Sequence, residues 1–194
     1  MTFFYCFLIG YLLGSLPFGL ILSKLFKKED PRKSGSRNFG ATNITRVSGW
    51  KIGLITLILD IFKAFIPVKI FINIDEQYAI IASIGVFFGH IYPIWLKFKG
   101  GKGVAVLIGI LFSHSVIYGL IYIISWLLVA MVTKYSSLSA LISSVVITIF
   151  IFFDSNTNFF LLLLILNIFI YFKHKNNITR LIYNKEPSIK FRKK

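Results

Sequence analysis

The sequence predicts an all-α, polytopic membrane protein with seven transmembrane helices, its N-terminus outside the cell and its C-terminus in the cytoplasm. Hydrophobic residues make up 56% of only 194 residues, which is too much apolar side chain for the interior of so small a soluble domain. Several stretches approach the length of about 20 apolar residues that crosses a bilayer. Most of the 22 Lys and Arg residues lie between those stretches. We therefore expect a single membrane-embedded domain over residues 1–194.

Six apolar stretches are candidate spans. They cover residues 2–22, 52–71, 77–96, 104–131, 138–153 and 159–172. The first contains Gly14, Ser15, Pro17 and Gly19, which predicts a kink or a close helix contact. It has neither a basic start nor a small-residue cleavage site, so we expect it to be retained rather than removed as a signal peptide. The fourth is either one long helix or two short helices separated at residues 113–115.

The basic residues decide this ambiguous stretch, because positive residues collect on the cytoplasmic side of a membrane. Of the 22 Lys and Arg residues, 20 lie within 23–51, 97–102, 134 and 173–194. These segments can share one side only if the chain turns back at residues 113–115, which gives seven membrane segments. The helix before that turn spans only about 17 Å, so we expect it to begin in a recess or to thin the bilayer.

The first basic loop has the composition of a ligand site. Its candidate ligands are Ser36, Asn38, Thr42, Asn43 and Arg46. Glycine lets a backbone approach a ligand, hydroxyl and amide groups form hydrogen bonds, and arginine binds oxyanions with its fork of N–H groups. A loop that only attracts anionic lipid headgroups would need lysines alone, so the pattern favours a specific ligand over that alternative.

The second basic loop predicts a phosphate site. Gly100, Gly101, Lys102 and Gly103 lead into an apolar stretch, so a glycine-rich turn would present the free N–H groups of a helix N-terminus to an anion. The turn is not a P-loop, because Gly103 stands where Ser or Thr should follow the Gly-Lys pair. A flexible basic turn is the alternative. For His90, just upstream, a structural hydrogen-bonding role competes with a binding role.

The third polar segment, residues 173–180, follows the last apolar stretch. If it is helical, His174 and Asn177 share a face and can point into one site, because residues three apart are neighbours on a helix. A solvated basic helix end is the alternative.

The apolar stretches carry two further features. Asp60 and Lys63 lie three apart near mid-membrane, where charges are costly unless paired or in a polar cavity, so they indicate either an ion pair or a proton relay. Two small-residue repeats predict close helix packing, Gly10-x-x-x-Gly14 and Gly85-x-x-x-Gly89.

Composition also excludes several classes of protein. A nucleic-acid-binding module would not be this apolar, and a disulfide scaffold needs more cysteines than Cys6. No His, Cys and carboxylate cluster has metal-ligand spacing, and the His-x4-Asp pattern of many acyltransferases is missing. We expect no metal and no cofactor.

In order and spacing, these motifs resemble the bacterial acyl-phosphate:glycerol-3-phosphate acyltransferases, the PlsY family, over nearly the whole chain. The matching motifs are Gly14-Ser15-Leu16-Pro17-Phe18-Gly19, Gly35-Ser36-x-Asn38-x-Gly40-Ala41-Thr42-Asn43-x-x-Arg46, Leu59-Asp60-x-x-Lys63, Gly89-His90-x-x-Pro93, Phe98-Lys99-Gly100-Gly101-Lys102-Gly103-Val104-Ala105, Tyr135-x-Ser137-Leu138 and His174-x-x-Asn177-Ile178-x-Arg180-Leu181. Arg37, Lys134 and Asn176 stand where the family pattern has Gly, Arg and Glu.

The resemblance implies an enzyme that moves an acyl chain from acyl phosphate to the sn-1 hydroxyl of glycerol 3-phosphate, giving lysophosphatidic acid and inorganic phosphate. The expected catalytic residues are Ser36, Arg46, Lys102, His174 and Asn177. The expected substrate-binding residues are Asn38, Thr42, Asn43, His90, Gly100, Gly101, Gly103, Ser137 and Arg180. We expect the three polar segments to meet in one cytoplasmic pocket of the bacterial inner membrane, surrounded by membrane lipids.

Several points stay open at the level of sequence. The proton acceptor is either His174 or a substrate phosphate, and either loop could hold either phosphate. Acyl-chain preference and oligomeric state, for which a monomer is the simplest case, are not fixed. A transporter of anionic metabolites is a rival class, although it would place polar residues along a path through the membrane. A structural lipid-binding protein is another, and it would tolerate Lys102→Ala.

Overall fold

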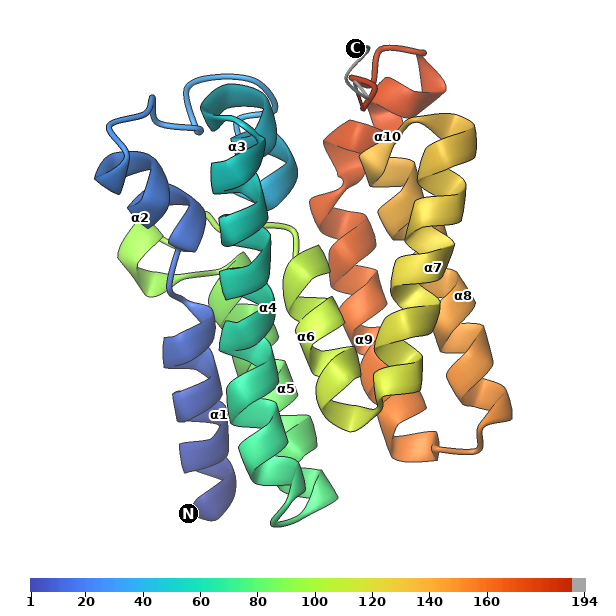
Figure 1. Cartoon of the computed structure of the whole chain (residues 1–194). Coiled ribbons are helices and arrows are strands. Elements are labelled where there is room, and N and C mark those ends of the chain that lie inside the picture. The colour runs from blue at the N-terminus through green and yellow to red at the C-terminus, as the bar shows by residue number, and fades with distance from the viewer. Residues whose placement is uncertain (190–194) are drawn as a thin grey trace. The chain divides into compact units, whose positions relative to one another are not determined.

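The protein is described by a computed structural model covering residues 1–189, in which helices are joined by turns (Figure 1). Within these residues there are ten α-helices, one short 3₁₀ helix and no strand. The chain divides into two compact units, one formed by Met1–His114 and the other beginning at Ser115. The all-α architecture predicted from the sequence is confirmed.

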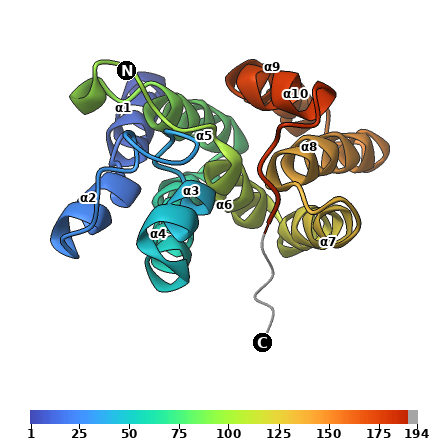
Figure 2. The same ribbon diagram turned by 90° about the horizontal axis from the view of Figure 1, so that it is seen from above.

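The first unit is built around three helices that pack against one another, α1 (Thr2–Gly14), α4 (Trp50–Ile72) and α5 (Glu76–Ile91). The shorter α6 (Val104–His114) packs on α4. Two eight-residue helices, α2 (Phe18–Leu25) and α3 (Ala41–Ser48), lie beside α4 at the end of this unit opposite the N-terminus (Figures 1 and 2). Helix α3 forms where the sequence predicted only a loop.

The first apolar stretch is broken at Ser15-Leu16-Pro17, as predicted. Proline has no N–H to donate and fixes its own backbone, so α1 ends at Gly14 and α2 starts at Phe18. The break is tied to the segment after α5, which contains the 3₁₀ helix η1 (Ile94–Leu96). The indole N–H of Trp95 donates to Ser15 Oγ over 2.7 Å. The segment between α5 and α6, which contains the glycine turn, is therefore bonded to the break between α1 and α2.

The two predicted small-residue repeats pack against each other. A Cβ added at Gly10 or Gly14 would overlap the backbone of α5 at Ala82 or Val86, and one added at Gly85 would overlap the backbone of α1 at Phe7. The absence of side chains at these positions lets the two helix backbones meet directly, which is how small residues stabilise helix pairs in membranes. This prediction is confirmed.

Gly85→Ala is expected to lower the stability of the first unit. The added Cβ has only backbone atoms to meet, so α1 and α5 must move apart, at a cost of about 1–3 kcal/mol. The measurement is the thermal unfolding temperature in detergent. As a control, Ile9→Val alters a side chain that is 42% exposed on α1 and should change that temperature little. Equal unfolding temperatures for Gly85→Ala and the unmodified protein would contradict the packing described here.

The second unit contains α7 (Val116–Thr133), α8 (Ser136–Phe153), α9 (Thr157–Lys173) and α10 (Lys175–Ile182). Helix α8 packs against both α7 and α9, and α10 lies near the start of α8. Helices α9 and α10 meet at an angle of 61° at His174, the single residue between them. The third polar segment is helical, which is the condition under which His174 and Asn177 were expected to share a face, and His174 directly precedes the helix.

Four described stretches are long and apolar enough to cross a membrane, and the bent pair of α9 and α10 would make a fifth. They are Thr2–Leu25, Glu76–Leu96, Val116–Thr133 and Ser136–Phe153. The predicted break at residues 113–115 is confirmed, since α6 ends at His114 and α7 begins at Val116. The seven-span count also requires the charged α4 and the 11-residue α6 to cross, so it stays a prediction, as does the orientation of the termini.

Candidate active site

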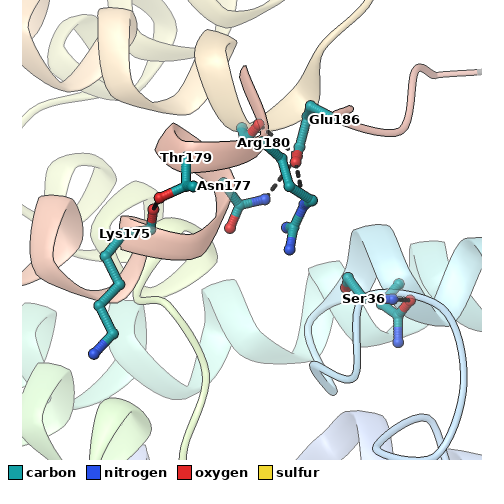
Figure 3. Close-up of polar contacts among 8 residues, drawn as sticks. Ser36, Lys175, Asn177, Thr179, Arg180 and Glu186 are labelled. Carbon is teal, nitrogen blue, oxygen red and sulfur yellow. Dashed lines mark hydrogen bonds and ion pairs between the residues drawn. The ribbon is translucent and has the colours of Figure 1, made fainter. Parts of the chain in front are cut away.

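The first basic loop is organised from within by the buried side chain of Asn43. Its Oδ1 accepts a hydrogen bond from the Ser36 N–H at 2.8 Å, which is drawn in Figure 3. Its Nδ2 donates to the backbone carbonyls of Pro31 and Asn38, over 2.9 and 2.7 Å. A single amide therefore holds several turns of the loop in one conformation, because both its donor and its acceptor atoms are bonded to loop backbone.

Helix α3 separates the structural residues of this loop from its exposed ones. Asn43 and Ile44 are buried, whereas Thr42 and Arg46 are exposed and lie one helical turn apart. Thr42 and Arg46 thus form a small polar face at the surface, as expected for residues that contact a ligand.

Arg37 in the same loop has a φ of +58°, in the left-handed region that favours glycine. The family pattern has glycine at this position. Arg37 thus adopts a backbone conformation that glycine would reach without a steric cost.

The glycine turn packs directly on His90. The Gly101 N–H donates to the backbone carbonyl of His90 at 3.0 Å, and a Cβ on Gly101 would overlap the His90 ring. Phe39, at the end of the first basic loop, packs edge-on against the same ring, with centroids 5.9 Å apart. His90 thus joins the first and second predicted segments within the first unit.

The turn then leads into α6 as predicted. Gly103 has a φ of +88° and a Cβ there would overlap the Phe87 ring, so only glycine fits. Helix α6 begins at the next residue, Val104. Lys102, directly before Gly103, is half-buried. Free N–H groups of a helix N-terminus beside a lysine form an arrangement that attracts phosphate.

In the second unit, three side chains meet at the carboxylate of Glu186. Ser137 Oγ and Asn177 Nδ2 donate to Oε1 at 2.7 and 2.6 Å, and Arg180 Nε forms an ion pair with Oε2 at 2.8 Å. Figure 3 shows Asn177 and Arg180 pointing toward Glu186. The structure thus brings three of the predicted site residues together from α8 and α10.

His174 is buried at the bend between α9 and α10, and its backbone carbonyl accepts from the Asn177 N–H. Its ring Nδ1 lies 2.8 Å from the Ile170 carbonyl oxygen. Because a carbonyl oxygen can only accept, Nδ1 carries a proton, and the neutral ring then has its lone pair on Nε2. That tautomer is the one a proton acceptor needs.

Comparison with known proteins places these features in a family. A family model described as glycerol-3-phosphate acyltransferase matches residues 4–184. The chain belongs to this family. A glycerol-3-phosphate acyltransferase of Pelagibacter ubique (strain HTCC1062) is 46% identical over 186 residues, covering 94% of this chain and 95% of the relative. One from Bartonella quintana (strain Toulouse) is 42% identical, covering 94% and 90%.

Solved structures of a family member are also similar to the whole chain. The crystal structure of PlsY (YgiH), an integral membrane glycerol 3-phosphate acyltransferase, in its glycerol 3-phosphate form, matches with a TM-score of 0.94 at 32% identity. It covers 98% of this chain and 96% of that one. Its lysophosphatidic acid form gives a TM-score of 0.91. The present protein is therefore an acyltransferase and an integral membrane protein.

Some predicted site residues bond within the protein, and the predicted residues also differ in burial. Asn38, Asn43 and His90 use polar atoms to hold the first unit together, so their substrate-binding roles remain predictions. In the first unit, Ser36, Thr42, Arg46 and Lys102 are half-buried or exposed. In the second unit, Ser137, His174 and Asn177 are buried.

Within residues 1–189 there is no group of three or more His, Cys, Asp or Glu side chains that could hold a metal ion.

Glu186 is the residue that sequence reasoning missed. It stands as the lone acidic residue among eight basic ones in residues 173–194, and that contrast was the available signal. Burial by itself would raise the pKa of Glu186, but the hydrogen bonds from Ser137, Asn177 and Arg180 outweigh this effect and hold the pKa below its ordinary value. The carboxylate thus stays charged and orients all three donors.

Glu186→Gln is expected to destabilise the protein at neutral pH by about 1–3 kcal/mol, because it removes a charged acceptor from three buried or half-buried donors. Since the folded pKa lies below the unfolded value of about 4.3, this stabilisation is fully present above that pH. It is lost as the pH falls through the folded pKa.

The measurement is the unfolding temperature of both proteins between pH 7 and pH 3, with Glu29→Gln, at an exposed carboxylate, as control. The gap between the unmodified protein and Glu186→Gln should close toward acid pH. A gap that stays constant over this range would refute the assignment.

Proposed function

We propose that this protein transfers the acyl chain of an acyl phosphate to the sn-1 hydroxyl of glycerol 3-phosphate. The hydroxyl oxygen forms a bond to the carbonyl carbon, the bond from that carbon to the phosphate oxygen breaks, and inorganic phosphate leaves. The products are lysophosphatidic acid and inorganic phosphate. The observation that carries the proposal is the match of the family model to residues 4–184, together with the glycine turn and Lys102 at the start of α6.

The chemistry of the substrates fits the residues available. Both substrates carry phosphate, and the similar PlsY structures are glycerol 3-phosphate and lysophosphatidic acid forms. Lys102 and the backbone of the glycine turn would hold one phosphate, while Arg46 and Thr42 would bind the other with Ser36. Because phosphate is a good leaving group, positioning and electrostatic stabilisation can supply most of the catalysis.

We further propose a seven-span protein of the bacterial inner membrane, with the N-terminus outside and the basic segments in the cytoplasm. The positive-inside rule supports this orientation, since the basic loops at 23–51 and 97–102 precede and follow spans that return to the same side. Helix α4 can cross because its Asp60 and Lys63 are paired, and α6 because a short helix can thin the bilayer.

The deciding experiment gives purified protein acyl phosphate and glycerol 3-phosphate, and measures lysophosphatidic acid and inorganic phosphate together. Equal amounts of the two products are expected, with no product when acyl-CoA or acyl carrier protein replaces acyl phosphate. Product formed only from acyl-CoA would contradict the donor assignment, and no product from any donor would contradict the function.

Lys102→Met should lower kcat/KM in this assay by about 10²–10³-fold, the range for losing one group that stabilises the transition state. Lys99→Met is the matched control. Lys99 is exposed in the same basic loop, and its removal should leave kcat/KM within about twofold. Equal losses in the two variants would mean that only the overall positive charge matters.

His174→Ala distinguishes the two proton acceptors. If Nε2 of His174 takes the hydroxyl proton, kcat should fall by more than about 10³-fold and recover at high pH, where the hydroxyl loses its proton more easily. If a substrate phosphate takes the proton, His174 only orients the hydroxyl. The loss in kcat is then smaller and stays the same from pH 6 to pH 9.

A further inference from the structure

Helix α4 carries a buried pair of charges that the proposed reaction does not use. Lys63 Nζ lies 2.6 Å from Asp60 Oδ1, and the two side chains are only 2% and 1% exposed. Charges so placed are retained at a considerable cost in solvation, which the pairing only partly offsets. The contacts of Lys63 beyond Asp60 suggest what the pair does.

Lys63 joins three separate parts of the first unit. An ammonium group has three N–H donors, and Lys63 Nζ meets three acceptors: Asp60, the Leu16 carbonyl at 2.7 Å and His90 Nδ1 at 3.0 Å. Leu16 lies in the break between α1 and α2, and His90 lies near the end of α5. Lys63 thus connects α4, the helix break and α5 through one nitrogen atom.

The contact with Lys63 also fixes the state of His90. A lysine ammonium can only donate, so His90 Nδ1 must carry the lone pair and the proton of the neutral ring sits on Nε2. This ring is the surface on which Gly101 packs, and the His90 carbonyl accepts the Gly101 N–H. A change in the position of His90 would therefore move the glycine turn.

We propose that Lys63, charged and held by Asp60, is a positioning residue for the phosphate-binding turn at residues 100–103. It acts through His90, whose ring and carbonyl set the conformation of the turn. This inference rests on the proposed function only in assigning a substrate phosphate to that turn. The rival explanation is that the pair merely stabilises the helix bundle.

The double variant Asp60→Asn/Lys63→Met separates the two explanations. It removes both charges together, so no unpaired charge is left buried, and such replacements are often tolerated. It also removes the donor to Leu16 and His90. Lys69→Met is the matched control, because Lys69 is a lysine of the same helix that contacts the Ser113 carbonyl instead, at 3.4 Å. Each protein is studied in detergent for unfolding temperature, steady-state kinetics and hydrogen exchange of the peptide containing Gly101.

The unfolding temperature of the double variant is expected to lie within a few degrees of that of the unmodified protein. Its KM for one of the two phosphorylated substrates should nevertheless rise about tenfold, while kcat changes by less than about threefold. The Gly101 peptide should exchange at least about tenfold faster. The control should match the unmodified protein in all three measurements. Unchanged KM for both substrates and unchanged exchange in the double variant would overturn the proposal.

Should the double variant fail to fold, Lys63→Arg answers the same question. Arginine keeps the charge beside Asp60, but its planar fork cannot place one nitrogen between Leu16 and His90. Faster Gly101 exchange and a raised KM are expected, and values equal to the unmodified protein would overturn the proposal. The exchange measurement needs no substrate, so it decides the positioning role even if the unmodified protein makes no lysophosphatidic acid.

Discussion

The hydrocarbon interior of a membrane offers no hydrogen-bond partner, and this constraint governs where the polar groups of the protein lie. Serine and threonine hydroxyls of α8 donate to carbonyls of their own helix, as Ser144 and Thr148 do. Asn167 of α9 donates to Thr148 of α8 at 2.7 Å and thereby links the two helices. The buried charges of α4 meet as a pair. These polar groups of the helices are thus bonded within the protein, and small residues let the backbones of α1 and α5 meet directly.

A few buried polar side chains organise the segments that carry the candidate site. Asn43 holds the first basic loop, His90 supports the glycine turn, and Glu186 gathers three donors in the second unit. Each is buried and bonded to several partners, so the groups around it are held in place before any substrate binds. Such preorganisation is what electrostatic catalysis requires, because donors that are already oriented need not reorganise during the reaction.

The two buried acidic residues of this protein each pair with a basic residue inside the fold. Only seven Asp and Glu residues occur in a chain of net charge +15, and Asp60 and Glu186 are the buried ones. Each is paired with a cation, Lys63 or Arg180. A phosphate-binding protein gains from an excess of positive charge at its surface, and carboxylates there would repel the ligand. The two buried carboxylates instead act inside the protein, where they orient donors.

The sequence by itself determined the class of the protein, the positions of the apolar stretches and the family. Apolar length, the positive-inside rule and the glycine spacings are local or additive properties, so they predicted the break at 113–115 and two faces for close helix packing. Only the tertiary structure decided which polar side chains serve the fold. Asn43 and His90 are bonded within the protein, helix α3 replaces part of a loop, and Glu186 joins Ser137 across 49 positions. Those partnerships depend on which segments meet in space, and spacing along the chain does not encode that directly.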